Sequence, residues 1–312
     1  MLIFKRSEQL TNTAKQIYIP IIAGKVTAGE FSKLFNIDLQ EQLAFFVTAE
    51  KPIKAGEIYE VPTKINEYAC ERIALVSLGK ASDQELRTAG AAIGRKLRNK
   101  NETVFLALTL KSNQFKSLLI SANLGNFQWS LKREQKSSIT QVCVPTDDGV
   151  VKSAQVISDA VNRARELIHT PSNIKSPEWL AKQAKRFANG AKVEVLSGTA
   201  LKEFGGLLAV GGSSPKPGPR FIKMTYSPRK SGVKHVVLVG KGITYDTGGI
   251  SLKRPYEIMA PMKSDMAGVA TCLSVISALR DLKPDVKVTA LLMCAENSIS
   301  ATAQRQIGRA HV

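Results

Sequence analysis

Cysteine and histidine are scarce in this sequence, and their scarcity excludes several kinds of site. The 312 residues include four cysteines and three histidines. The histidines form no H-E-x-x-H pair, which excludes a zincin-type protease. The cysteines form no C-x-x-C pair, so no thiolate metal site or dense disulfide framework is indicated, and we expect free, mostly buried thiols at Cys70, Cys143, Cys272 and Cys294. Any metal is therefore expected to be held mainly by oxygen.

Long hydrophobic runs are also missing. No apolar run approaches the roughly 18 residues that a membrane helix needs, and the opening MLIFKRSEQLTNTAK carries too short an apolar segment for a secretory signal. We therefore expect a cytoplasmic location and no membrane partner. The composition, with 44% hydrophobic and 22% charged residues, is that of a globular protein, and the length suits two domains.

Acidic residues are few compared with basic ones. The chain has 44 Lys and Arg against 26 Asp and Glu, a net charge of +18. Residues 151–250 carry 16 basic and 6 acidic residues, a net charge of +10, whereas residues 1–50 carry 5 of each. No run of five or more like charges occurs, which favours an ordinary solvated surface. The alternative that stays open is a DNA-binding protein or non-catalytic scaffold that uses this basic surface.

The first half of the chain shows strands and helices in alternation. The pattern predicts a strand at Arg72–Leu78, a helix at Asp83–Arg98 and a strand at Thr103–Leu110, which together form a parallel βαβ unit. A long amphipathic helix at Lys152–His169 follows, and it ends before the TPSN turn. We place the domain boundary just before or within this helix, which gives domains of residues 1–150 and 151–306.

The second half continues the alternation. Ser176 and Pro177 are typical of a helix start, so we predict a helix through Phe187. The remaining predicted elements are strands at Val193–Leu196, Arg220–Tyr226, His235–Val239 and Val286–Cys294 and helices at Thr199–Phe204 and Met266–Leu282. We therefore expect both domains to be α/β with mostly parallel sheets.

A glycine-rich, charged segment follows the apolar run HVVLV. Residues 239–249 read VGKGITYDTGG, and ligands in α/β sheets bind beyond the carboxyl ends of strands. Buried ionised groups are costly unless they are paired or bound to a metal. Residues 241–265 gather two aspartates and three lysines: Lys241, Asp246, Lys253, Lys263 and Asp265.

Three interpretations of this cluster can be compared. A phosphate-binding P-loop needs G-x-x-x-x-G-K-[ST] opening a helix, but Gly242 follows Lys241 and we expect no helix before about Asp265. In a dinuclear metal site, Asp246 and Asp265 would supply carboxylate oxygens and Lys241 would bind through its neutral amine. A plain lysine–aspartate salt bridge at a strand end accounts for the spacing equally well.

The segment VGKGITYDTGGISLK…MKSDMAGVA resembles the signature of the leucyl aminopeptidase (cytosol aminopeptidase) family. The family pattern runs V-G-K-G-[LIV]-T-[FY]-D-[ST]-G-G-[ILY]-S-[IL]-K and then M-K-x-D-M-x-G-[AG]-A. ARELIHTPSN, LLAVGGSSPKPGPRFIKMTYSP and AEN at 295–297 resemble further family motifs. Residues 1–150 resemble its macro-type N-terminal domain by organisation, and the rest resembles the first portion of its zinc-peptidase-like catalytic domain.

The resemblance implies a metallo-exopeptidase that releases N-terminal residues from peptides, with a leucine-type preference. It implies that two divalent cations, Mn²⁺ or Zn²⁺ or else Mg²⁺, activate the attacking water. It implies that Lys241, Asp246 and Asp265 are metal ligands, with Asp246 bridging both cations, and that Lys253 stabilises the oxyanion. Lys263 is expected to be structural. The resemblance also implies a homo-hexamer for the full-length protein.

The sequence departs from the family pattern in two places. Arg254 is an extra residue in the loop after Lys253. After AEN, the family motifs that supply an aspartate, a glutamate and an anion-holding arginine do not follow, and the chain ends with IGRAHV, Ile307–Val312. This hexapeptide is the translation of a common sequencing adapter, ATC GGA AGA GCA CAC GTC. We therefore expect a non-native tail at 307–312, and a chain that is inactive and prone to aggregate through an exposed edge left beside Val286–Cys294.

Overall fold

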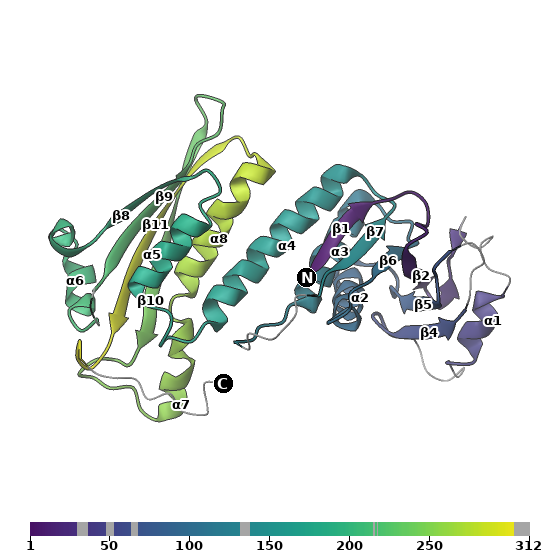
Figure 1. Cartoon of the computed structure of the whole chain (residues 1–312), viewed down its shortest axis with the longest axis horizontal. Helices are drawn as coiled ribbons and strands as arrows, with labels where there is room; N and C mark the ends of the chain where they lie inside the picture. Colours follow the sequence, from purple (N-terminus) through teal and green to yellow (C-terminus); the bar gives the residue numbers. More distant parts are fainter. Residues whose placement is uncertain are drawn as a thin grey trace. The chain divides into compact units, whose positions relative to one another are not determined.

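The structure is a computed structural model that describes residues 1–29, 37–47, 53–63, 68–131, 138–214, 216 and 218–302. The chain divides into two compact units, Met1–Asp159 and Ala160–Val312. The division falls inside one long helix, Asp148–His169. Each unit contains a sheet and helices, which confirms the predicted α/β class (Figure 1). The tail predicted to be non-native, residues 307–312, lies outside the described residues.

A seven-stranded sheet forms the first unit, in the order β1-β7-β6-β2-β5-β4 with β3 beside β2. Parallel pairing joins β1, β7, β6, β2 and β5, whereas β3 and β4 are antiparallel to their neighbours. The prediction of a mostly parallel sheet is confirmed for this unit. Its strands are β1 (Leu2–Arg6), β2 (Ala14–Ile22), β3 (Lys25–Val26), β4 (Ile58–Pro62), β5 (Arg72–Ser77), β6 (Thr103–Leu106) and β7 (Thr140–Val144).

Helices cover both faces of this sheet because its central strands are apolar on both sides. In β2, Ile17, Ile19 and Ile21 lie in the cluster that includes α1, whereas Tyr18 lies in the cluster that includes α2 and α3. A capping box between Ser82 and Glu85 starts α2. The helices are α1 (Leu39–Ala44), α2 (Asp83–Lys96), α3 (Ser112–Asn126) and α4 (Asp148–His169), which passes into the second unit.

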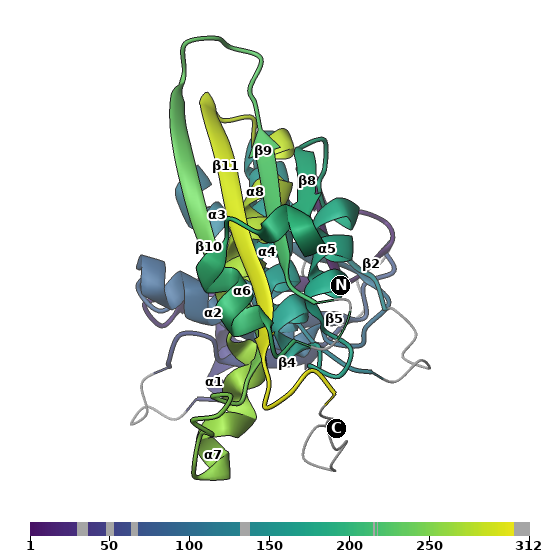
Figure 2. The same ribbon diagram turned by 90° about the vertical axis from the view of Figure 1, so that its left-hand side faces the viewer.

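The second unit is built on a four-stranded sheet in the order β10-β11-β9-β8, and Figure 2 shows these strands side by side. Its strands are β8 (Lys192–Leu196), β9 (Arg220–Tyr226), β10 (Lys234–Asp246) and β11 (Val286–Asn297). Only β10 and β11 are parallel, so the prediction of a mostly parallel sheet is wrong here. Parallel strands need a crossover of a dozen or more residues, and residues 227–233 between β9 and β10 are too few for one.

Two long helices cover one face of this sheet and a short helix lies on the other. Figure 1 shows α5 and α8 on one side of β8–β11 and α6 on the opposite side. As predicted, Ser176 caps α5, and its side chain accepts a hydrogen bond from the Trp179 N–H. The helices are α5 (Pro177–Arg186), α6 (Gly205–Gly211), α7 (Tyr256–Met259) and α8 (Ala267–Leu282), with 3₁₀ helices η2 (Gly198–Leu201) and η3 (Ala260–Ser264).

Several short elements differ from the prediction. The helix expected at Thr199–Phe204 is the 3₁₀ helix η2, and α6 follows it in a glycine-rich segment that was not predicted to be helical. The expectation of no helix before about Asp265 is wrong, because α7 and η3 precede that residue. None of the helices in the described part of the chain combines the length and apolar composition that a bilayer span requires.

Candidate functional site

Strand β10 carries the glycine-rich motif. We predicted that this strand ends at Val239, but it continues through Asp246. Its register with β11 pairs Lys241 with Met293 and Asp246 with Asn297. Residues that were expected in a loop after the strand therefore lie within it, at its carboxyl end.

Glycines allow helix α8 to lie directly against β10. A methyl group on Gly268 would lie 2.9 Å from the Lys241 backbone nitrogen, and one on Gly240 would lie 3.0 Å from the Gly268 carbonyl. A methyl group on Gly242 would lie 2.6 Å from the Met293 carbonyl oxygen. No larger residue fits these backbone contacts without movement, so the glycines determine how closely the start of α8 approaches the strand.

This close approach brings Asp265 to Lys241. Asp265 lies two residues before the first residue of α8, and its Oδ2 is 3.1 Å from the Lys241 Nζ. The lysine side chain is 62% exposed and the aspartate side chain 20% exposed. Although the ammonium is within ion-pair distance, it is not oriented to donate a hydrogen bond, and Oδ2 is buried without a hydrogen-bond partner.

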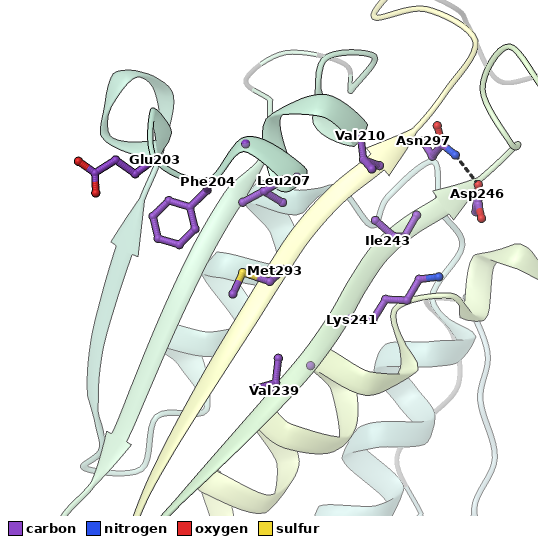
Figure 3. A pocket seen from close by; sticks show the side chains of 13 residues that line it. Glu203, Phe204, Leu207, Val210, Val239, Lys241, Ile243, Asp246, Met293 and Asn297 are labelled. Carbon is purple, nitrogen blue, oxygen red and sulfur yellow. Dashed lines mark hydrogen bonds between the residues drawn. The ribbon is translucent and has the colours of Figure 1, made fainter.

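The carboxylate of Asp246 accepts two hydrogen bonds and forms one ion pair. Its Oδ1 accepts from the Gly248 N–H at 2.9 Å and from the Asn297 side-chain amide at 2.7 Å (Figure 3). Its Oδ2 lies 3.2 Å from the Lys253 Nζ. Burial acts to raise the pKa of Asp246, but these three partners together hold it below its ordinary value. The carboxylate is therefore ionised at neutral pH.

A tight turn after β10 returns Lys253 to Asp246. Gly248 and Gly249 have φ of +89° and +64°, in the left-handed region that favours glycine. The Lys253 N–H donates to the Thr247 carbonyl at 2.9 Å, which closes the turn. The Thr247 hydroxyl and N–H both donate to the Asn297 carbonyl and so attach the turn to β11.

The four predicted site residues thus lie together as two lysine–aspartate pairs at one end of β10. Within the described ranges, no group of three or more His, Cys, Asp and Glu side chains gathers in a metal-binding arrangement. The salt-bridge interpretation accounts for both ion pairs, although the buried Asp265 Oδ2, 3.1 Å from the Lys241 Nζ, accepts no hydrogen bond. A carboxylate oxygen of this kind is also a suitable ligand for a hard divalent cation.

A pocket of about 680 Å³ opens beside these pairs. Figure 3 shows Lys241, Asp246 and Asn297 at one side of the pocket, Glu203 at the other, and mainly apolar side chains between them. The apolar lining includes Phe204, Leu207, Val210, Val239, Ile243 and Met293. Helix α6, which was not predicted, supplies one wall of this pocket.

Two polar residues at the end of β11 have contacts that the sequence analysis did not assign. Asn297 donates to Asp246, as described above, and its position opposite Asp246 in the register explains why. Glu296 is buried, and its carboxylate accepts hydrogen bonds from Ser298 at 2.6 Å and Thr244 at 3.4 Å. The AEN motif at 295–297 indicated that these residues matter, but their hydrogen bonds to Asp246 and Thr244 depend on the pairing of β11 with β10.

The second unit can be compared with known protein families. Residues 162–307 match the catalytic domain of the cytosol aminopeptidase family. The chain belongs to the cytosol aminopeptidase family. The match begins in the second half of α4 and includes β10, β11 and the ion-paired residues between them.

Curated relatives in this family extend the similarity to most of the chain. A probable cytosol aminopeptidase of Aquifex aeolicus is 32% identical over 269 residues, which cover 81% of this chain and 54% of the relative. One from Micrococcus luteus is 37% identical over 246 residues, covering 73% of this chain and 48% of the relative. The chain therefore spans about half the length of the curated relatives that it matches.

Two solved structures share the fold of this chain. The bottromycin maturation enzyme BotP in complex with Mn is similar with a TM-score of 0.75 and 27% identity, over 94% of this chain and 62% of that chain. A mutant of tomato leucine aminopeptidase is similar with a TM-score of 0.73 and 23% identity, over 98% of this chain and 64% of that chain. The second likeness concerns the fold alone.

Proposed function

We propose that the whole protein is a metal-dependent aminopeptidase that releases N-terminal residues from peptides, and that this chain holds its N-terminal domain and the first part of its catalytic domain. One observation carries the proposal. Two lysine–aspartate pairs, Lys241–Asp265 and Lys253–Asp246, lie at the carboxyl end of β10, and the buried Asp265 Oδ2 accepts no hydrogen bond from the described residues. Family membership supports the reaction class.

The residues have separate roles in this proposal. Asp246 and Asp265 would hold the divalent cations through their carboxylates, and Lys241 would join them as a ligand through its deprotonated, neutral amine. When bound, the cations supply Lewis acidity toward the peptide carbonyl. Lys253, which Asp246 holds in place, stabilises the negative charge that develops on the carbonyl oxygen. BotP, a structural relative, is a Mn complex, which supports Mn²⁺ as one metal to test, together with Zn²⁺ and Mg²⁺.

The apolar pocket supports a leucine-type preference. Leu207, Ile243 and Met293 line the same pocket as Lys241 and Asp246, and an apolar side chain of an N-terminal residue would fit among them. We also propose that the 312-residue chain by itself does not catalyse hydrolysis, because its described residues supply only two carboxylates to the candidate metal centre. Assembly into a hexamer, a cytoplasmic location and DNA binding stay predictions.

The decisive experiment removes one carboxylate at a time from the whole protein. We expect Asp246→Asn and Asp265→Asn each to reduce kcat/KM for leucyl p-nitroanilide by at least about 100-fold in the presence of Mn²⁺. Asparagine keeps the shape of the aspartate side chain but removes the carboxylate that would bind the metal. Asp285→Asn is the matched control, since Asp285 is an exposed aspartate paired with Lys230. Unchanged hydrolysis in both ligand variants would exclude this mechanism.

A further inference from the structure

Lys175 is a fully buried lysine in the turn between α4 and α5. Its relative exposure is 0%, and it is among the largest fully buried side chains of the chain. Removing an ammonium from water is costly unless hydrogen bonds replace the lost hydration. The buried ammonium group of Lys175 therefore needs hydrogen-bond acceptors within the protein.

Three backbone carbonyl groups accept hydrogen bonds from the Lys175 Nζ. The distances are 3.2 Å to the Leu167 oxygen, 3.1 Å to the Ile168 oxygen and 2.7 Å to the Lys263 oxygen. An ammonium has three donors, and these described residues offer it three acceptors. The backbone N–H of Lys175 also donates to the Pro171 carbonyl at 2.9 Å, which fixes the turn that carries the side chain.

Two of the three acceptors belong to the last turn of α4. The final carbonyl groups of a helix have no partner within the helix and carry its partial negative charge. A lysine at this end is therefore favourable for the helix itself. This contact alone would make Lys175 a helix cap and nothing more.

The third acceptor connects the lysine to the candidate metal centre. Lys263 belongs to η3, and its carbonyl group lies two residues before Asp265. This bond is the shortest of the three. It crosses 88 residues of sequence and joins the turn after α4 to η3, just before Asp265. After Asp265, the chain enters α8, whose Gly268 lies close to the Lys241 backbone.

We propose that Lys175 is a positioning residue for Asp265. It anchors the backbone that precedes this aspartate to the end of α4, so that the Asp265 carboxylate stays beside Lys241. The inference rests on the proposed function, since it assigns Lys175 to the support of a metal ligand. Lys175 itself does not touch the substrate or the cation.

The test uses Lys175→Met in the 312-residue chain, because methionine keeps the length of the side chain and removes its three donors. Hydrogen exchange of the Asp265 amide, which donates to the Met262 carbonyl at 3.1 Å, reports on the anchored segment without any metal. We expect its exchange to become at least about tenfold faster, while amides in β9 keep their rates. Mn²⁺ affinity, measured by electron paramagnetic resonance, is expected to fall about tenfold.

Leu180→Ala is the control for a general loss of stability. Leu180 is fully buried in the core of the same unit, so its truncation lowers the unfolding temperature without removing a hydrogen bond to Lys263. Unchanged exchange at Asp265 in Lys175→Met, or the same change in Leu180→Ala at equal loss of stability, would overturn the positioning role. Absence of Mn²⁺ binding by the unmodified chain would count against the proposed function, while the exchange result would still decide the role of Lys175.

Discussion

Cationic side chains gather near the carboxyl end of α4, and they affect the histidine there. Burial lowers the pKa of His169, and Lys263, Arg165 and Lys175 lower it further by repulsion of the imidazolium. The folded protein therefore binds a proton at His169 less readily than the unfolded chain does.

This difference makes stability depend on pH. In the unfolded chain His169 takes up its proton near pH 6.5, whereas in the folded chain it does so only at lower pH. Unfolding is therefore favoured as pH falls below about 6.5, and the loss levels off below the folded pKa. We expect the free energy of unfolding to fall less between pH 7.5 and 5.5 in His169→Asn than in the unmodified chain, as measured by urea denaturation. An equal fall in both proteins would contradict the assignment, and comparison at pH 8.5, where the imidazole is neutral in both states, is the control.

At the scale of elements, the packing of α8 on β10 determines the candidate site. Gly240 and Gly268 belong to the sequence motif that resembles the family pattern. In the structure, Gly268 lies in close backbone contact with Gly240 and Lys241. That contact brings the start of the helix, and with it Asp265, to the strand.

A single methyl group tests this contact. We expect Gly268→Ala to lower the free energy of unfolding by about 1–3 kcal/mol, because its Cβ would lie 2.9 Å from the Lys241 nitrogen and the helix or strand must move. Chemical denaturation measures the effect.

Gly149→Ala is the matched control within helix α4. A methyl group there meets no atom within 4 Å, so the better helix propensity of alanine is expected to leave stability unchanged or raise it by up to about 1 kcal/mol. If both variants were equally stable, the contact between α8 and β10 would not constrain the site.

At the scale of the whole chain, the exposed edge of the second sheet differs from the one that we expected. The strand at Val286–Cys294 was predicted to lose its neighbour, but β11 lies between β10 and β9, and the edge strands among the described residues are β10 and β8. The apolar run HVVLV in β10 is typical of a buried strand. Its valines are instead exposed, with 44% for Val236, 50% for Val237 and 68% for Val239.

An exposed apolar edge strand favours self-association. We expect the 312-residue chain to associate in a concentration-dependent manner, and Val239→Lys to reduce this association, as measured by sedimentation velocity. Ile250→Lys is the control, since Ile250 is fully exposed but lies in the turn beyond the strand. Equal association of Val239→Lys and the unmodified chain would show that another surface is responsible.

The sequence by itself determined the α/β class, most element positions, and the family, because hydrophobic periodicity and helix caps act locally and the motif is dense. Ser176 and Pro177, for example, correctly predicted the start of α5. The tertiary structure alone decided which strand forms the edge, the mixed direction of the second sheet, and the contacts of Lys175. These features depend on partners far apart in the chain, such as the carbonyl group of Lys263, 88 residues from Lys175. Local patterns report that a residue is buried, but the partner that it meets is decided by how the elements pack.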